Sequence, residues 1–410
     1  MMELVAPAGN LEKLTYAWEY GGDAAYIGLK NFSLRVKADN FHDDEHRIIA
    51  DLKARYAAED RQKRLFCALN IAFRNRDIDA FLDQKDYFRA YPFDAFIVQD
   101  LGIIRILQKE FPDMPLHLST QANCLNAEAV KMYRDLGIRR VVLAREASLA
   151  EIAEIKQRVP DMELECFAHG AMCIAYSGRC LMSAYMTGRS ANAGFCSHSC
   201  RWEYRYVEEK ERPGEYFPVL EGDDFTAVFS SRDLCMIDHL DDLEKAGVDA
   251  VKIEGRMKSL YYTALTTRAY RKQLDALAGK ITPAEAAPFV QELYHAAHRE
   301  FGTGFYYDRA DADSVTTGES KSPYKLAGTI GERVLGTEDS WIFNSMNKIT
   351  DSDVLEAVGP DIVSVKLTDA VLVNPETGEK RDWVCHGHPC VIRTGAPIDR
   401  GFIIRTPESY

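Results

Sequence analysis

The chain has 410 residues, of which 46% are hydrophobic and 28% charged, so it is long enough for one large globular domain followed by a small one. Its formal net charge of −13 argues against a protein that simply coats nucleic acid, although an enzyme that modifies RNA needs no more than a local basic patch. No apolar run approaches the length of a membrane-spanning helix, and the N-terminus MMELVAPAGN lacks a secretion signal, so we expect a cytoplasmic protein without a membrane partner.

The first 170 residues alternate between short apolar runs and helical patterns. Most runs are followed by a helical segment of the length that a crossover between parallel strands requires. Asn10, for example, stands where it can cap a helix that continues to Tyr20. With the later run at Ala250, the expected strands are Leu4–Pro7, Ala24–Leu29, Leu65–Ile71, Ala95–Val98, Leu116–Ser119, Arg140–Leu143, Glu163–Phe167 and Ala250–Ile253.

Eight strand–helix units predict a TIM-like (β/α)8 barrel, for which we expect residues 1–277. A doubly wound open sheet is the alternative. However, no G-x-G-x-x-G sequence follows the first strand, and no other nucleotide-binding fingerprint is found. The stretch Ala227–Ser230 could form an additional strand, which leaves the closure of the barrel undecided.

Polar residues that follow the expected strands identify a candidate active site. In a barrel of this type, catalytic groups lie at the carboxyl ends of the strands. Each position alone carries little weight, because loop residues are polar anyway, but together they predict a crowded mouth. These residues are Tyr26, Asn70, Asp100, Ser119, Thr120, Gln121, Asn123, Arg145, Glu146, His169 and Glu254.

A cysteine-rich insertion leaves the barrel after the seventh expected strand. Residues 165–202 hold five of the ten cysteines, and four of them follow the spacing C-x6-C-x15-C-x3-C: Cys173, Cys180, Cys196 and Cys200. Disulfides would need an oxidising compartment. A structural zinc site usually has two short C-x2-4-C pairs, of which this stretch has one. An iron–sulfur cluster tolerates irregular spacing, so the spacing favours a cluster, followed by zinc and by unrelated thiols.

Beyond the barrel the pattern changes. Residues 278–324 indicate a helical segment and a linker rich in Asp, Ser, Thr and Gly. Short strands separated by turn residues fill residues 325–410 and predict a small C-terminal β-barrel domain. Two cysteines and two histidines lie within Cys385–Cys390, but side chains so close in sequence rarely all face one ion. We therefore interpret that cluster as a β-turn with incidental thiols.

The run ECFAHGAMCIAYSGRCLMS, Glu165–Ser183, resembles the signature of peptidase family U32, the collagenase-like proteins. VAPAGNLEKL near the N-terminus and VKIEGRMKS, Val251–Ser259, are similar to other blocks of that family, so the resemblance spans essentially the whole chain. It implies RNA hydroxylation more than proteolysis, because relatives act on a tRNA wobble uridine, a ribosomal RNA cytidine or, without oxygen, on ubiquinone. It also implies a [4Fe–4S] cluster on cysteines of this region and, for the RNA-acting members, prephenate as hydroxyl donor.

The resemblance and the barrel geometry together suggest roles for the candidate residues. We predict that the cluster ligands are Cys173, Cys180, Cys196 and Cys200, with Cys235 as an alternative ligand. Prephenate carries two carboxylates, so an arginine clamp is expected. The predicted substrate-binding residues are Arg145, Arg256, Gln121 and Asn70. The predicted catalytic residues are Glu254, as an acid or base or merely an ion-pair partner, and His169, as a proton donor or merely a strand-end histidine.

These assignments predict an RNA hydroxylation protein that forms 5-hydroxyuridine at the tRNA wobble position. Its partners would be tRNA and prephenate or a similar small dicarboxylate, and a sister subunit is an open question. A collagenase-like peptidase, with Cys173 and His169 as nucleophile and base, is the alternative. The two hypotheses exclude each other, because a thiolate that ligates iron cannot also attack a peptide. A scaffold that uses its cluster for folding alone is the third hypothesis.

Overall fold

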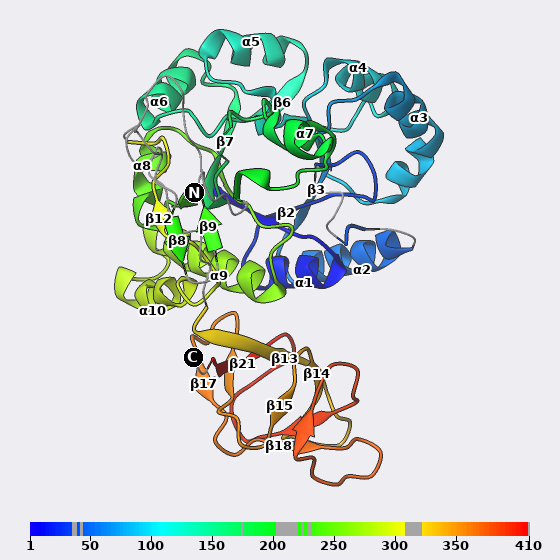
Figure 1. Cartoon of the computed structure of the whole chain (residues 1–410), viewed down its shortest axis with the longest axis vertical. Helices are drawn as coiled ribbons and strands as arrows, with labels where there is room; N and C mark the ends of the chain where they lie inside the picture. Colours follow the sequence, from blue (N-terminus) through cyan, green and yellow to red (C-terminus); the bar gives the residue numbers. More distant parts are fainter. Residues whose placement is uncertain are drawn as a thin grey trace.

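A computed structural model describes residues 1–34, 39–41, 44–173, 175–201, 220–222, 225–227, 231–307 and 322–408. Over these residues the chain forms a barrel of parallel strands ringed by helices, with an all-β unit beside it (Figure 1). The barrel strands are β1 (Glu3–Pro7), β2 (Ala24–Ile27), β3 (Arg64–Leu69), β4 (Ala95–Val98), β5 (Leu116–Leu118), β6 (Ile138–Val142), β7 (Glu163–Ala171) and β11 (Ala250–Ile253). Strand β11 pairs in parallel with both β1 and β7 and closes the ring, which confirms the predicted TIM-like barrel.

Helices cover the outside of the barrel, and several begin where the sequence supplies a cap. The side chain of Asn10 accepts a hydrogen bond from the amide of Lys13 at 2.9 Å, and Ser148 and Glu151 form a capping box. The helices around the barrel are α1 (Leu11–Glu19), α2 (Glu45–Ala58), α3 (Asn75–Ala90), α4 (Leu101–Glu110), α5 (Ala127–Asp135), α6 (Leu149–Arg158), α8 (Leu240–Lys245) and α9 (Leu260–Leu277). Within the described part of the chain, no helix combines the length and the apolar character needed to cross a bilayer.

The chain leaves the barrel after β7 and returns to it at β11. The described elements of this excursion are the helix α7 (Met182–Thr187), the 3-10 turns η2 (Ala191–Ala193) and η3 (Ser199–Arg201), and the strands β8 (Leu220–Gly222), β9 (Phe225–Ala227) and β10 (Asp233–Cys235). Strand β10 lies antiparallel to β7 and beside the short β12 (Phe301–Gly302). Of the possible extra strand Ala227–Ser230, only Ala227 is described, and it is the last residue of β9. Residues 228–230 lie outside the described residues.

Residues from Tyr324 onward form a curled antiparallel sheet, drawn below the barrel in Figure 1, which confirms the predicted β fold of the C-terminal region. Its strands, in spatial order, are β17 (Val365–Lys366), β16 (Glu356–Val358), β21 (Ile403–Pro407), β13 (Tyr324–Arg333), β14 (Ser340–Ser345), β20 (Val391–Arg393) and β18 (Val371–Val373). A separate pair consists of β15 (Ile349–Thr350) and β19 (Trp383–Val384). The predicted limits between the three segments stay predictions.

Buried charges and a tyrosine join the β unit to the barrel. The guanidinium of Arg405, on β21, contacts the carboxylates of Glu356 at 2.9 Å and of Glu292, on α10 (Pro283–Leu293), at 2.5 Å. Tyr20, at the end of α1, donates from its hydroxyl to the backbone carbonyls of Val358 and Gly401, both at 3.0 Å. Arg405 is 1% exposed and Glu356 lies on its own side of the contact, so separating the two parts would break the buried ion pair between Arg405 and Glu292.

Candidate functional site

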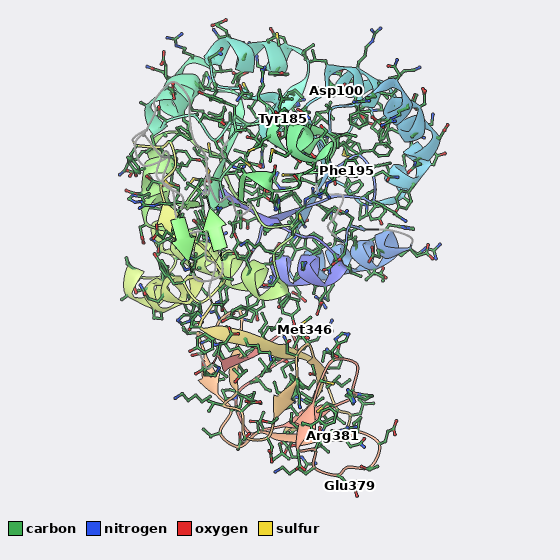
Figure 2. The ribbon with its side chains drawn as sticks, in the orientation of Figure 1. Asp100, Tyr185, Phe195, Met346, Glu379 and Arg381 are labelled. Carbon is green, nitrogen blue, oxygen red and sulfur yellow. The ribbon has the colours of Figure 1, made fainter. Side chains whose placement is uncertain are left out.

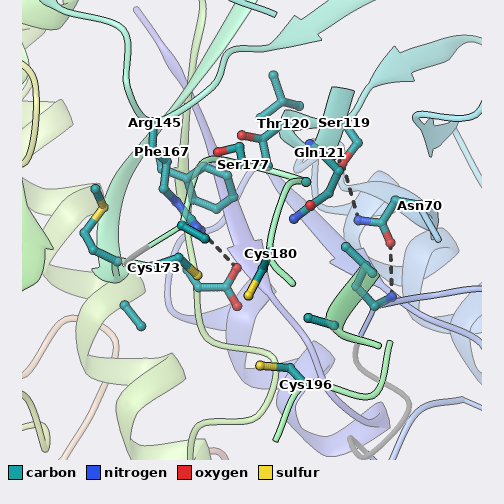
Figure 3. A pocket seen from close by; sticks show the side chains of 18 of the residues that line it. Asn70, Ser119, Thr120, Gln121, Arg145, Phe167, Cys173, Ser177, Cys180 and Cys196 are labelled. Atoms are coloured by element: carbon teal, nitrogen blue, oxygen red, sulfur yellow. Dashed lines mark hydrogen bonds and ion pairs between the residues drawn. The ribbon is translucent and has the colours of Figure 1, made fainter. Parts of the chain in front are cut away.

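A cavity of about 400 Å³ opens at the carboxyl ends of the barrel strands, where the predicted barrel places catalytic groups. Of the residues to which the sequence analysis assigned a role, all except His169 and the alternative ligand Cys235 line it, and Figure 3 shows several of them; Asp100 and Asn123, two further candidates after strand ends, do not line it. The predicted residues that line it are Asn70, Gln121, Arg145, Cys173, Cys180, Cys196, Cys200, Glu254 and Arg256. Residues that follow the four strands β3, β5, β6 and β11 and residues of the cysteine-rich insertion thus meet at one place, although they are spread over most of the barrel sequence.

The insertion lies against the barrel mouth because hydrogen bonds and a glycine allow a close approach. The amide of Ser177 donates to the carboxylate of Glu146 at 2.8 Å. Gly178 has a φ of +74°, and a Cβ at this position would lie 2.0 Å from the backbone oxygen of Gln121. Any side chain at residue 178 would therefore push the insertion away from the end of β5.

A second contact fixes the far end of the insertion. The amide of Ala72, just beyond β3, donates to the backbone oxygen of Asn192 at 3.0 Å. The side-chain amide of Asn192 donates in turn to the backbone oxygen of Cys180 at 3.3 Å. The two halves of the insertion are thereby held to each other and to the barrel.

The four predicted ligands line one cavity without forming an assembled metal site. Figure 3 shows the side chains of Cys173, Cys180 and Cys196 around the same space. Among the described residues, no three His, Cys, Asp or Glu side chains stand close enough together to hold a metal ion. Four thiols suit an iron–sulfur cluster in number and chemistry, since thiolates are its usual ligands. Holding one would require the insertion to draw these side chains closer together.

Arg145 and Glu254 form an ion pair at the wall of the cavity. The Nη2 atom of Arg145 lies 3.4 Å from Oε2 of Glu254, marked by a dashed line in Figure 3. The guanidinium also lies 3.9 Å from the ring centroid of Phe167, so the ring supports one face of it. A 3.4 Å contact is long for a charged hydrogen bond, so a ligand carboxylate could compete with Glu254 for Arg145.

Arg256, the second predicted clamp residue, lines the cavity from the loop after β11 and is 3% exposed. Its Nη1 atom donates to the hydroxyl of Ser33 at 3.4 Å, and its guanidinium lies 5.9 Å from the ring centroid of Tyr26. A Cβ at Gly28 would lie 2.1 Å from Nη1, so this glycine makes room for the guanidinium. Two arginines therefore line one cavity, as a clamp requires, and their role as a clamp stays a prediction.

Amide groups line another part of the cavity wall. The Oδ1 atom of Asn70 accepts from the amide of Leu34 at 3.2 Å, and its Nδ2 atom donates to the hydroxyl of Ser119 at 3.4 Å (Figure 3). The backbone amide of Gln121 donates to the same hydroxyl at 3.3 Å. Asn70 and Gln121 are thus fixed next to each other, where they can meet the polar edge of a ligand.

Deeper in the barrel lies a charged group that the sequence analysis missed. Lys252, which also lines the cavity, contacts Glu165 at 2.7 Å, and Arg140 contacts Glu165 at 3.0 Å. Glu165 is fully buried, and burial alone would raise its pKa, but Lys252 and Arg140 lower the pKa to about 2. Charged residues at alternate positions of apolar strands were the available signal, since alternate side chains of a barrel strand point inward.

The structure places His169 away from the cavity. The side chain is 1% exposed and is surrounded by the rings of Tyr262, Tyr270 and Phe301, with centroids 5.2 to 5.8 Å away. Burial lowers its pKa to about 3, so the imidazole is neutral near pH 7. The geometry supports neither a proton donor nor a base for Cys173 at this position. Cys235, the alternative ligand, lies on β10 and is also absent from the cavity lining.

The second cluster of cysteines and histidines forms a surface turn. The amide of His388 donates to the backbone oxygen of Cys385 at 3.1 Å, and Gly387 has a φ of +80°, which confirms the predicted β-turn. The thiol of Cys385 lies 3.1 Å from Nδ1 of His388, whereas Cys390 is buried in the sheet. The two thiols of this turn thus occupy different environments.

A barrel whose mouth is lined by cysteines of this spacing matches a known family of proteins. The family model described as peptidase family U32 matches residues 9–316, and the chain belongs to this family. It is 39% identical over 343 residues to the tRNA hydroxylation protein P of Escherichia coli (strain K12), covering 74% of each chain. It is 37% identical over 399 residues to the tRNA hydroxylation protein P1 of Bacillus subtilis (strain 168), covering 94% of this chain and 89% of that protein. The collagenase of Porphyromonas gingivalis (strain ATCC BAA-308 / W83) is 29% identical over 317 residues, covering 74% and 73%.

Proposed function

We propose that this chain is an RNA hydroxylase that forms 5-hydroxyuridine at the wobble position of tRNA in the cytoplasm. In this proposal it holds a [4Fe–4S] cluster on Cys173, Cys180, Cys196 and Cys200, and takes the hydroxyl group from prephenate or a similar small dicarboxylate. The observation that carries the proposal is the single cavity in which these four thiols meet Arg145 and Arg256. Two relatives named as tRNA hydroxylation proteins, similar over 74% and 94% of the chain, support it.

The charges of the cavity suit an anionic donor next to anionic thiolates. Arg145, Arg256 and Lys258 line it against the carboxylates of Glu146 and Glu254, whereas Lys252, which also lines it, is neutralised by Glu165. This excess of positive charge favours ligands that carry carboxylates. A donor with two carboxylates can contact both guanidiniums at once, which fixes its position and its orientation.

The remaining residues position the base and move protons. When bound, the cluster would supply one-electron chemistry or a site for an oxygen-bearing ligand at the cavity wall. Asn70 and Gln121 offer amide groups that can pair with the carbonyl and N–H groups on the edge of uracil. Oε2 of Glu254 is the atom at which we place the proton transfer, because this carboxylate faces the same space.

The decisive experiment compares two cysteine variants in a strain that lacks the gene. Native protein and the control Cys385→Ser, altered in the surface turn, should both restore 5-hydroxyuridine in tRNA hydrolysates measured by mass spectrometry. Cys180→Ser should restore none and should lack the cluster, whereas anaerobically purified native protein should hold about four irons per chain. Full modification by a Cys180→Ser protein without a cluster would contradict the proposal.

A collagenase-like peptidase is the second candidate, favoured by the similarity to a protein named collagenase. Such an enzyme would need a base next to its nucleophile, but His169 is enclosed by aromatic rings outside the cavity that Cys173 lines. The test is gelatin cleavage by iron-free protein. Cleavage that disappears in Cys173→Ser would establish the peptidase, and its absence together with tRNA modification would remove this candidate.

A further inference from the structure

The cysteine-rich insertion has a charge pattern opposite to that of the whole chain. Between Cys166 and Trp202 the sequence has no aspartate or glutamate, but it has Arg179, Arg189 and Arg201. The whole chain has 63 acidic and 50 basic residues, so an acid-free stretch of this length is unusual for it. Arg179 and Arg189 are exposed, and neither forms an ion pair with another described residue. The insertion therefore offers a locally positive surface at the mouth of an acidic protein.

The same insertion exposes large apolar side chains. Tyr185 is 88% exposed, Leu181 75% and Phe195 45%. Tyr176 is 54% exposed and also lines the cavity. Figure 2 shows Tyr185 and Phe195 on the insertion, in front of the barrel strands. Leu181 and Phe195 are next in sequence to Cys180 and Cys196, which line the cavity, and exposed apolar side chains gathered on one segment mark a surface that contacts a partner.

The backbone that carries these side chains is held by hydrogen bonds. The buried hydroxyl of Ser183 donates to the backbone oxygen of Arg189 at 2.7 Å and accepts from the amide of Ser197 at 3.0 Å. Helix α7 ends at Gly188, which has a φ of +68°. Tyr185 and Phe195 thus stand on a preformed scaffold, so a flat partner can bind them with little loss of backbone entropy.

We propose that Tyr185 and Phe195, together with Arg179 and Arg189, form an aromatic rim on which unpaired bases of the RNA substrate stack. The inference rests on the proposed function. It adds the protein surface that binds the RNA and the RNA structure, a single-stranded loop, that this surface accepts. Unpaired bases stack on aromatic side chains, and guanidiniums contact the phosphates between them. A continuous duplex hides its bases, so the rim selects a single-stranded loop.

Tyr176 connects the rim to the cavity. It is exposed like the rim residues, yet it lines the cavity together with Gln121 and Asn70. A loop whose neighbouring bases stack on the rim can therefore pass its target base over Tyr176 to these amide groups. Taking the base out of its stack costs least in an RNA loop, where pairing is already absent.

The absence of acidic residues from residues 166–202 is why RNA fits this surface better than a protein partner. A protein partner would favour rim charges of both signs, whereas a polyanion is repelled by carboxylates and attracted by arginines. The amide groups of the cavity beneath the rim also suit a nucleobase. A sister subunit docked on the same side chains is the competing occupant, and the experiment separates the two.

The test uses full-length protein purified anaerobically with its iron, and a labelled anticodon stem–loop RNA with an unmodified wobble uridine. We expect Tyr185→Ala and Phe195→Ala each to weaken binding in fluorescence anisotropy about tenfold, the loss typical of a removed stacking partner. The control Trp383→Ala removes an aromatic side chain that is 46% exposed on the β unit, and should bind like the native protein. Arg179→Gln should weaken binding. It should also make the slope of the logarithm of the binding constant against the logarithm of salt concentration shallower by about one, the change expected for one lost phosphate contact.

The outcomes distinguish this inference from the proposed function. Weaker binding in the rim variants with unchanged iron content, and native binding of the stem–loop in preference to a fully paired hairpin, support the rim. If the Tyr185→Ala, Phe195→Ala double variant binds the stem–loop as tightly as native protein, the rim is overturned while the hydroxylase proposal stands. If these substitutions release a bound protein subunit and leave RNA affinity unchanged, the surface is a protein interface and the rim is also overturned. If native protein neither binds nor modifies tRNA, the proposed function itself fails.

Discussion

Two layers of charge inside the same barrel are held in different ways. In the deeper layer Glu165 contacts Lys252 at 2.7 Å and Arg140 at 3.0 Å, and all three side chains are at most 4% exposed. In the layer at the mouth, Arg145 and Glu254 are 3.4 Å apart, and their side chains are 10% and 17% exposed. The deeper layer is closed by its own partners, whereas the mouth layer faces a cavity with room for a ligand.

The difference in burial and pairing indicates which charged residues serve the fold and which are available to bind a ligand. Removing one member of a buried ion-pair group destabilises the fold strongly, because it leaves a buried charge uncompensated. A loosely paired, partly exposed charge contributes little to folding and can exchange its partner for a ligand. We therefore expect substitutions in the deeper layer to change stability, and substitutions at the mouth to change activity.

The largest effect on folding should come from Glu165→Ala. It leaves Arg140 and Lys252 buried without their shared carboxylate, and should lower the free energy of unfolding by about 3–5 kcal/mol. Urea titration followed by circular dichroism measures this loss. The matched control is Glu163→Ala, which also removes a partner of Arg140 but from a side chain that is 51% exposed, so it should cost below about 1 kcal/mol. Equal losses in the two variants would show that burial does not distinguish the layers.

Glu254→Gln, at the mouth, should lower activity and leave stability unchanged. If Oε2 of Glu254 transfers a proton, the variant should lose about a hundredfold or more of its turnover, with an unchanged midpoint of urea unfolding. The measurement is single-turnover modification of tRNA transcripts across a range of pH. A loss below about tenfold with an unchanged pH profile would reduce Glu254 to an ion-pair partner of Arg145.

Substitutions of the two cavity arginines should act on donor binding. Arg145→Gln and Arg256→Gln each remove a charged hydrogen-bond donor, so each should raise the KM for the dicarboxylate about tenfold or more. Arg145→Lys keeps the charge but loses the planar group over Phe167, and should fall between native protein and Arg145→Gln. Arg134→Gln, on the exposed face of α5, is the control and should leave KM unchanged. An unchanged KM in both cavity variants would argue against the clamp.

Most of the barrel could be predicted because its strands are continuous apolar runs. The predicted strands Ala95–Val98 and Ala250–Ile253 coincide with β4 and β11, and most of the polar residues after the strand ends line one cavity, with Asp100, Asn123 and His169 as the exceptions. The cysteine spacing also predicted residues that meet at this cavity. The pairing of Glu165 with Lys252 joins strands far apart in the sequence, and a single sequence does not reveal such partners.

His169 shows where reasoning from strand position fails. The prediction ended the seventh strand at Phe167, whereas β7 continues to Ala171. Simple alternation would then point His169 inward with Phe167. However, the register shifts between Lys252 and Ile253, so that Phe167 pairs with Lys252 and His169 with Ile253. This irregularity turns His169 to the outer side of the strand, against Tyr262 and Tyr270.

The buried position of His169 leads to the smallest predicted effect, which appears on acidification. Burial lowers the pKa of His169, and likewise that of His117, from the ordinary 6.5 to about 3. Between these values the unfolded chain binds more protons than the folded one, so stability is full above about pH 6.5 and falls as the pH drops towards 3. His169→Phe keeps a ring in the aromatic enclosure and should make the fall of the melting temperature shallower in this window. His386→Phe, in the exposed surface turn, is the matched control for a histidine-to-phenylalanine change outside the aromatic enclosure. An identical fall in native protein and His169→Phe would show that His169 is protonated in the folded state as readily as in the unfolded chain.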